Sequence, residues 1–128
     1  MLVIDSSAWI EWLTESPLAP DVSLHMPARE EIVVPTLVQL ELIKWLARER
    51  GEEAADEMLA LTQMCQVVPL TIPIAVEAAE LCRAQRLSTA DAIILATAHN
   101  AGAGLLTCDK HFSGLPGVHY VAKPGTTS

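Results

Sequence analysis

Basic residues are scarce in this sequence. Lysine and arginine together number 8 against 16 aspartates and glutamates, which gives a formal net charge of −8. Proteins that coat duplex nucleic acid by bulk electrostatics need clustered lysine and arginine side chains, so the composition excludes that class. Two kinds of partner stay compatible with the charge: a short nucleic acid held by a few local cations and bound metal, and a basic protein attracted to the acidic surface.

Long apolar runs are also missing. None reaches the roughly 18 residues that a membrane-spanning helix needs, and the first residues lack the basic flank of a signal peptide. We therefore expect no membrane contact and a soluble, cytoplasmic protein. Cysteine is rare as well: Cys65, Cys82 and Cys108 are far apart and have no CxxC spacing. This pattern indicates inert buried thiols rather than a disulfide framework or a zinc site.

Aromatic residues are few, at 4% against 51% hydrophobic residues overall, so the core must consist mainly of alanine, leucine, valine and isoleucine. That composition is typical of helices packed on a parallel sheet. Short β-like runs alternate with helical patterns along the chain. Strands are predicted at residues 2–4, 32–35, 67–70, 104–107 and 118–121. Helices are predicted just after Asp5 and at residues 36–50, 52–66, 73–85 and from 88 or 89 to 101.

Several helix boundaries have capping signals. Ser6 or Ser7 is available as the N-cap of the first helix, and Thr36 with Gln39 three residues later has the pattern of a capping box. Gly51 is expected to end that second helix. The segment before it, residues 16–30, contains three prolines and is predicted to be irregular, with a short helix as an option.

Strands separated by helices imply right-handed crossovers and a parallel sheet with helices on both faces. We therefore predict the α/β class: a single three-layer α/β/α domain with a parallel sheet of about five strands over residues 1–122, followed by a C-terminal tail at 123–128. In such sheets ligands bind outside the carboxyl ends of the strands. Asp5 and Asp109 each stand at or just past such an end.

Two further acids occupy helix faces that are largely apolar. Glu41 lies within the helix that begins near Thr36, and three of its four neighbours at three and four residues' distance are apolar. Asp91 opens the run ADAIILATA, whose residues on the same face are also apolar. An ionised carboxylate directed toward a core costs several kcal/mol unless a counter-charge or a metal ion meets it. The same requirement therefore holds for four acids: Asp5, Glu41, Asp91 and Asp109.

If these four acids converge, their mutual repulsion raises their pKa values unless divalent cations lie among them. Oxygen ligands without accompanying histidine or cysteine suit Mg²⁺ or Mn²⁺. One or two such ions, roughly 3.5–4 Å apart when paired, can activate a water molecule and stabilise the leaving oxygen of a phosphodiester. The pattern thus predicts nuclease chemistry.

Each acid also has a purely structural interpretation. Asp91 follows Ser88 by three residues and fits the acidic position of a capping box. Asp5 fits an N-cap at a strand-to-helix turn, and Asp109 fits a turn residue. Glu41 has the weakest structural alternative, because its helix face is apolar.

Four short motifs resemble the PIN domain family, and more narrowly the VapC toxin ribonucleases of bacterial type II toxin-antitoxin pairs. Asp5 lies in VIDSSAWIEW, Glu41 in VPTLVQLEL, Asp91 in STADAIILATA and Asp109 in LLTCDKHF. The motifs occur in the order and spacing of the family, and the resemblance covers nearly the whole chain. His111 departs from the pattern, since some relatives have a further acid there, and the completeness of a second metal site stays open.

The resemblance implies a PIN-like parallel sheet flanked by helices, with an acidic pocket that binds one or two Mg²⁺ or Mn²⁺ ions and cuts single-stranded or looped RNA. It carries over two sets of residues by position: the catalytic, metal-binding acids Asp5, Glu41, Asp91 and Asp109, and the supporting hydroxyls of Ser6 and Thr107, which orient carboxylates or water. It further implies a homodimer, and a cognate VapB-type antitoxin whose C-terminal segment lies over the active site. Operator DNA would be bound only through that antitoxin.

Two other classes fit part of the pattern. A haloacid-dehalogenase-like phosphatase needs a second aspartate two residues after the first, where this sequence has Ser7, and a receiver domain needs an adjacent acidic pair near its first strand. The Walker pattern GxxxxGK[ST] is absent as well. The other class is a non-catalytic binding module that keeps the fold, and the presence of all four acids argues against it.

Overall fold

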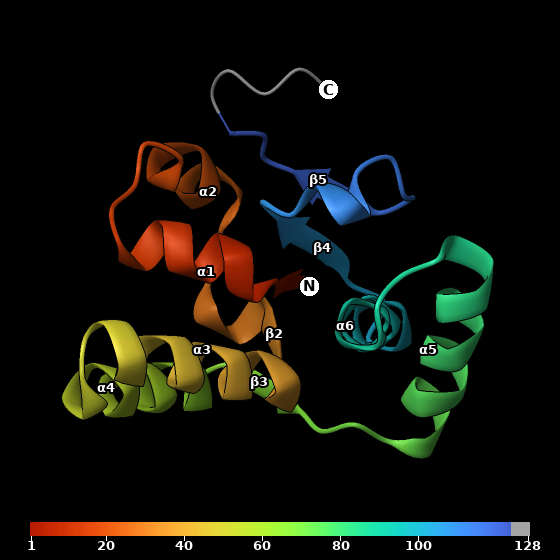
Figure 1. Cartoon of the computed structure of the whole chain (residues 1–128), viewed down its shortest axis with the longest axis horizontal. Helices are drawn as coiled ribbons and strands as arrows, with labels where there is room; N and C mark the ends of the chain where they lie inside the picture. Colours follow the sequence, from red (N-terminus) through yellow and green to blue (C-terminus); the bar gives the residue numbers. More distant parts are fainter. Residues whose placement is uncertain (124–128) are drawn as a thin grey trace.

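The computed structural model describes residues 1–123. Along this part of the chain five strands alternate with helices and form one sheet (Figure 1). The strands are β1 (Leu2–Ile4), β2 (Ile32–Pro35), β3 (Gln66–Val68), β4 (Gly104–Thr107) and β5 (Val118–Tyr120). Their order is β3-β2-β1-β4-β5, and all neighbours are parallel. The predicted α/β class with a parallel five-stranded sheet is confirmed. Of the predicted tail at 123–128, residues 124–128 lie outside the described residues.

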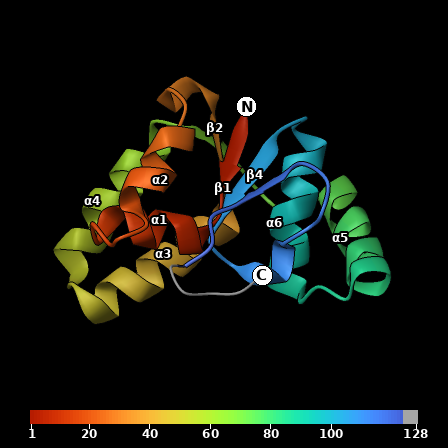
Figure 2. The ribbon, with the colours of Figure 1, turned by 90° about the horizontal axis from the view of Figure 1, so that it is seen from above.

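Helices lie on both sides of the sheet, as Figure 2 shows. One side has α1 (Ser6–Leu13), α2 (Ala19–His25), α3 (Thr36–Glu49) and α4 (Glu52–Gln63). The other side has α5 (Ile72–Gln85) and α6 (Thr89–Asn100), and α6 contacts β1, β2 and β4. Two 3-10 turns, η1 (Arg29–Glu31) and η2 (Lys110–Phe112), precede β2 and follow β4. The three-layer arrangement therefore matches the prediction.

The central strands are buried because helices cover both of their faces. β1 and β2 are buried at every position, and β4 is buried at every position after Gly104. Their sequences, LVI, IVVP and GLLT, are nearly continuous apolar runs, as expected of strands covered on both faces. α6 is buried over most of its surface, and small alanines at positions 92, 96 and 98 let it lie close to the sheet.

The strand order changes direction beside β1. From β1 the chain proceeds to β2 and then to β3, and it returns to place β4 on the opposite side of β1. The connections that follow β1 and β4 therefore diverge, and the carboxyl ends of such a pair of strands are where parallel sheets form a ligand-binding crevice. Asp5 follows β1 and Asp109 follows β4, so the topology positions both acids at this crevice.

Predicted boundaries agree with the structure to different degrees. Three strands, β1, β2 and β4, have the predicted limits. The third strand begins and ends one to two residues earlier than predicted, α4 ends at Gln63 rather than at residue 66, and the fifth strand ends one residue earlier. The irregular segment at 16–30 contains the short helix α2, whose first turn accommodates Pro20 because proline lacks the amide that a helix start leaves unpaired.

Two capping predictions were wrong. The N-cap residues of α1 and α3 are Asp5 and Pro35, and neither makes a side-chain capping bond. The expected cap residues have other partners: Ser6 donates to Glu41 from its position inside α1, and Gln39 donates to a side chain of α4. Tertiary contacts therefore took precedence over local capping.

Two composition-based expectations have structural counterparts. Cys108 is buried, whereas Cys65 and Cys82 are only partly buried, so the expectation of buried thiols holds fully at one position. Within residues 1–123, every helix is too short or too polar to cross a membrane.

Candidate active site

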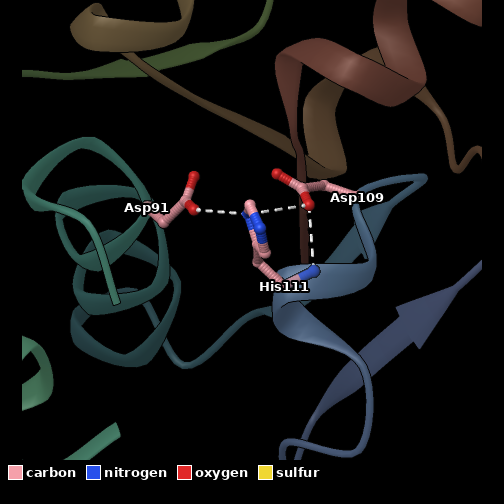
Figure 3. Close-up of side chains that lie close together, drawn as sticks. All are labelled: Asp91, Asp109 and His111. Carbon is pink, nitrogen blue, oxygen red and sulfur yellow. Dashed lines mark hydrogen bonds and ion pairs between the residues drawn. The ribbon is translucent and has the colours of Figure 1, made fainter. Parts of the chain in front are cut away.

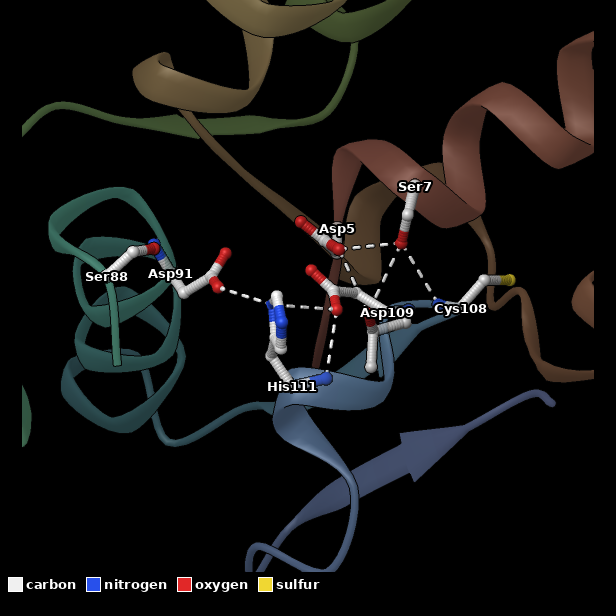
Figure 4. Close-up of polar contacts among 8 residues, drawn as sticks. Asp5, Ser7, Ser88, Asp91, Cys108, Asp109 and His111 are labelled. Carbon is white, nitrogen blue, oxygen red and sulfur yellow. Dashed lines mark hydrogen bonds and ion pairs between the residues drawn. The ribbon is translucent and has the colours of Figure 1, made fainter. Parts of the chain in front are cut away.

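Four acidic side chains gather at the carboxyl edge of the sheet. Asp5 follows β1, Asp109 follows β4, Glu41 lies in α3 and Asp91 lies in the first turn of α6. Figure 4 shows Asp5, Asp91 and Asp109 around one space. The charges of Asp91 and Asp109 reach Asp5, and the charges of Asp5 and Asp91 reach Glu41. The structure thus brings together all four acids that the sequence singled out.

Asp5 is the most buried of the four, with 3% of its surface exposed. Ser7 Oγ donates to its Oδ2 at 2.7 Å, and Thr107 Oγ1 donates to the same oxygen at 2.9 Å. Each hydroxyl accepts a backbone N–H in turn. Ser7 accepts from Cys108 at 3.0 Å, as Figure 4 shows, and Thr107 accepts from Asp109 at 2.9 Å. Because each hydroxyl has one proton and gives it to Asp5, the network fixes the carboxylate and ties the ends of β1 and β4 together.

Burial is the main cause that raises the pKa values in this cluster. It raises the pKa of Asp5, the two hydroxyl hydrogen bonds oppose that rise, and the neighbouring carboxylates add to it. It also raises the pKa of Glu41, whose Oε1 accepts a hydrogen bond from Ser6 Oγ at 3.0 Å. Burial and the charge of Asp109 raise the pKa of Asp91. No lysine or arginine among residues 1–123 forms an ion pair with these acids. Lys44 lowers the pKa of Glu41 and His111 lowers that of Asp91, but these effects are smaller than that of burial, so a bound cation would stabilise the cluster further.

His111 joins the acid cluster from η2. Its Nδ1 lies 3.2 Å from Asp109 Oδ1 and 3.7 Å from Asp91 Oδ2 (Figure 3). One ligand atom from each of these three residues lies within 4.8 Å of the other two, which is close enough for all three to bind one ion. In the sequence, His111 stands out as a departure from the family pattern. Its two-residue spacing from Asp109 was the signal that pointed to a shared site.

Two of the acids also have the structural roles that the sequence left open. The amide of Asp91 donates to Ser88 Oγ at 3.3 Å, and Asp109 Oδ1 accepts the amide of His111 at 2.9 Å. The first bond does not use the Asp91 carboxylate, and the second uses one carboxylate oxygen of two. Asp5 makes no side-chain capping bond. Capping and a place in the acid cluster are therefore compatible.

Sequence reasoning missed Ser7. It assigned hydroxyl support to Ser6 and Thr107, and the structure places Ser6 against Glu41 and Thr107 against Asp5. Ser7, the adjacent residue of the same type, makes the shortest bond to Asp5. The sequence offers no signal that separates the two serines, because the partner amide of Ser7 lies 101 residues away.

The thiol of Cys108 also borders this site, and burial raises its pKa to about 11. A thiol with that pKa is protonated at neutral pH, and the thiolate is the reactive form. The reactive thiolate form of Cys108 is therefore disfavoured at neutral pH.

The raised pKa values predict the direction in which the stability of metal-free protein changes with pH. A carboxyl whose pKa is higher in the folded state holds more protons there than in the unfolded state, so its contribution to stability falls as pH rises. The fall begins near the ordinary values of 3.8 for aspartate and 4.5 for glutamate and ends above the raised folded values. We expect the gain in melting temperature of Asp5→Asn over the parent protein to grow as pH rises above about 4 in EDTA.

The matched control for this measurement is Asp56→Asn, which neutralises an exposed aspartate of α4. The difference in melting temperature between Asp56→Asn and the parent protein should not grow with pH. An Asp5→Asn variant whose relative stability declines as pH rises would contradict the pKa assignments.

Comparisons with known proteins agree with this geometry. The sequence matches the PIN domain family over residues 2–118. No curated protein matches it. A toxin-antitoxin complex from Klebsiella pneumoniae superposes with a TM-score of 0.80 at 20% identity, over 94% of this chain and 100% of that chain. FitAcB from Neisseria gonorrhoeae superposes with a TM-score of 0.74 at 20% identity, over 87% of this chain and 89% of that chain.

A third solved structure carries a functional description. VapC20 from Mycobacterium tuberculosis, described as a toxin that cleaves the sarcin-ricin loop, superposes with a TM-score of 0.72 at 22% identity, over 92% of this chain and 97% of that chain. At these identities the structural likeness establishes the fold. The family match spans most of the sequence and includes all four clustered acids. The chain therefore belongs to the PIN domain family.

Proposed function

We propose that this protein is a metal-dependent endoribonuclease toxin that cuts single-stranded or looped RNA. The observation that carries the proposal is the convergence of Asp5, Glu41, Asp91 and Asp109 at the crevice beside β1. Raised pKa values and the absence of a lysine or arginine partner within the described part of the chain support a cation among these acids. The loop-cleaving relative VapC20 supports RNA as the substrate class.

The donor set fits a hard divalent cation. Carboxylate oxygens from four residues suit one or two Mg²⁺ or Mn²⁺ ions, and the imidazole nitrogen of His111 favours Mn²⁺, which accepts nitrogen donors more readily than Mg²⁺ does. When bound, such an ion supplies an activated water molecule and stabilisation of the leaving oxygen.

The chain's own residues contribute orientation. Ser7 and Thr107 hold the carboxylate of Asp5 in one position, and Ser6 does the same for Glu41. Fixed ligands lower the reorganisation needed when the substrate phosphate arrives.

The proposal includes two protein contacts. A cognate VapB-type antitoxin neutralises the enzyme in the cytoplasm, as the toxin-antitoxin complexes among the structural relatives support. A second copy of the chain forms a homodimer. Its support is a set of large apolar side chains exposed on α3, on the segment after β3 and on α5: Leu40, Leu70, Ile72 and Val76.

The test is cleavage of a total RNA pool by antitoxin-free protein in Mg²⁺, Mn²⁺ or EDTA, with single-stranded DNA in parallel. We expect a small set of defined RNA fragments in either metal, none in EDTA, and intact DNA. The fragments are read by primer extension, which also gives the cleavage sites.

Three outcomes would contradict parts of the proposal. Equal cleavage in EDTA would remove the metal requirement, and equal cleavage of DNA would remove the preference for RNA. Intact RNA in every condition would indicate a binding module that keeps the fold without the activity.

A further inference from the structure

A hollow next to the acid cluster contains two of the chain's three lysines, Lys110 and Lys123. It has a volume of about 390 Å³, and its lining includes Asp109 of the acid cluster and Ser7, which donates a hydrogen bond to Asp5. Tyr120, the only tyrosine of the sequence, also lines it. Figure 4 shows Ser7 and Cys108, which both line the hollow, on the far side of Asp5 from Asp91. We call this hollow the lysine pocket.

We propose that the lysine pocket binds the nucleotide of the RNA that adjoins the phosphodiester to be cut. This inference rests on the proposed endoribonuclease function and names a substrate subsite for it. The pocket adjoins the acids through Ser7 and Asp109, so a strand whose phosphate lies at the acids has its next nucleotide at the pocket.

The charges of the pocket fit a phosphate. Lys110 and Lys123 are exposed, and neither forms an ion pair among the residues that the structure describes. Glu11 is the one acid of the pocket outside the acid cluster, so the two ammonium groups outnumber it. Asp109 also lines the pocket, so its two lysines equal its two acids in number, and they exceed the acids once a bound cation meets the charge of Asp109. In a chain of net charge −8 with three lysines, two lysines at one hollow are a distinct feature. Lysine is a point-charge donor that suits phosphate oxygens.

The shape and the aromatic wall fit a nucleotide. Small-ligand pockets span roughly 300–1,000 Å³, so a hollow of about 390 Å³ takes one nucleotide rather than a protein helix. Tyr120 is partly buried and lies in register with Thr107 of the neighbouring strand. Tyr120 lines the same hollow as Asp109, where a base can stack on its ring without sequence preference.

The test measures binding apart from cleavage. All variants are made in protein that carries Asp5→Asn, so that the RNA is not cut. Each protein is titrated into a short fluorescein-labelled single-stranded RNA in Mg²⁺ at a series of salt concentrations, and binding is read from fluorescence anisotropy. In that background we expect Lys110→Gln and Lys123→Gln each to weaken binding roughly three- to tenfold and to reduce the slope of log affinity against log salt by about 0.7, the value for one lost single-strand phosphate contact. Tyr120→Leu should weaken binding at least about fivefold and leave the slope unchanged.

Arg29→Gln is the matched control. Arg29 is exposed and precedes β2, which places it at the amino edge of the sheet, opposite the acids. The same loss of one positive charge there should leave affinity and slope as in the Asp5→Asn parent. Melting temperatures of all variants establish that they fold, and if Tyr120→Leu does not fold, the two lysine variants decide the proposal.

The outcomes separate this inference from the proposed function. Intact RNA with the unmodified protein in Mg²⁺ and Mn²⁺ would overturn the function itself. If the unmodified protein cuts RNA but the lysine variants bind RNA as tightly as Arg29→Gln does, only the inference about the lysine pocket would be overturned. Unchanged RNA affinity with weakened binding to a purified antitoxin would assign the pocket to that protein partner and would likewise overturn the inference.

Discussion

Asp5→Asn should lower the rate of RNA cleavage by more than about a hundredfold in Mg²⁺ or Mn²⁺. Asp5 is the most buried acid of the cluster, and two hydroxyl groups fix its carboxylate at the crevice. Losing a residue that only supports a metal ligand already costs roughly 10- to 100-fold in affinity or activity, so losing the ligand itself should cost more. The measurement is single-turnover cleavage of one RNA fragment from the pool.

The same substitution should leave the fold intact. Asparagine has nearly the same volume, and its carbonyl oxygen can accept the hydrogen bonds from Ser7 and Thr107. It also removes a buried charge that the other carboxylates repel, so metal-free Asp5→Asn should melt no lower than the parent protein.

The control is again Asp56→Asn on the exposed side of α4, which should cut RNA at the parent rate. A rate for Asp5→Asn within tenfold of the parent would show that this carboxylate is structural. A variant that melts well below the parent would shift the explanation from lost catalysis to lost folding.

Divalent cations should raise the melting temperature by roughly 10 °C. An ion that binds only the folded state at 100 times its dissociation constant adds about 2.7 kcal/mol to the free energy of unfolding. For a chain of 128 residues each kcal/mol corresponds to roughly 4 °C. The stabilisation has a physical source in the acid cluster, because the cation relieves repulsion that raises the pKa values of Asp5, Glu41 and Asp91.

Differential scanning fluorimetry with Mn²⁺ or Mg²⁺, against NaCl at equal ionic strength, checks this prediction. Asp91→Asn should lose more than half of the shift, since Asp91 lies with Asp109 and His111 in the group whose ligand atoms are mutually close. An equal shift in Asp91→Asn would place the ion elsewhere. An equal shift in NaCl would reduce the effect to general screening of surface charge.

The class and layout of the fold were predictable from sequence because their signals are local. LVI, IVVP and GLLT are short apolar runs with helical patterns between them, and such alternation admits a parallel sheet and little else. The carboxyl ends of the strands were predictable for the same reason, since Asp5 and Asp109 stand at or just past the ends of apolar runs. Helix ends were less predictable. α4 ends at Gln63, three residues before the predicted limit, and the prediction missed this end because no glycine or proline marks it.

The acids were predictable because a carboxylate on an apolar helix face contradicts its surroundings. Glu41 and Asp91 stand out by that contrast alone, without knowledge of their neighbours in space. The capping alternative for Asp91 was equally local, and Asp91 does take part in a helix cap.

The sequence by itself thus determined the α/β sheet, the two strand ends that meet at the crevice and the four acids, since each depends on residues within a few positions of one another. The tertiary structure decided which serine holds Asp5, that His111 joins Asp91 and Asp109, and that two lysines and a tyrosine line a pocket beside them. Those features depend on contacts such as the one between Ser7 and Cys108, 101 residues apart. Periodicity and spacing do not encode such contacts, because they arise only when the crossovers bring β1 and β4 side by side.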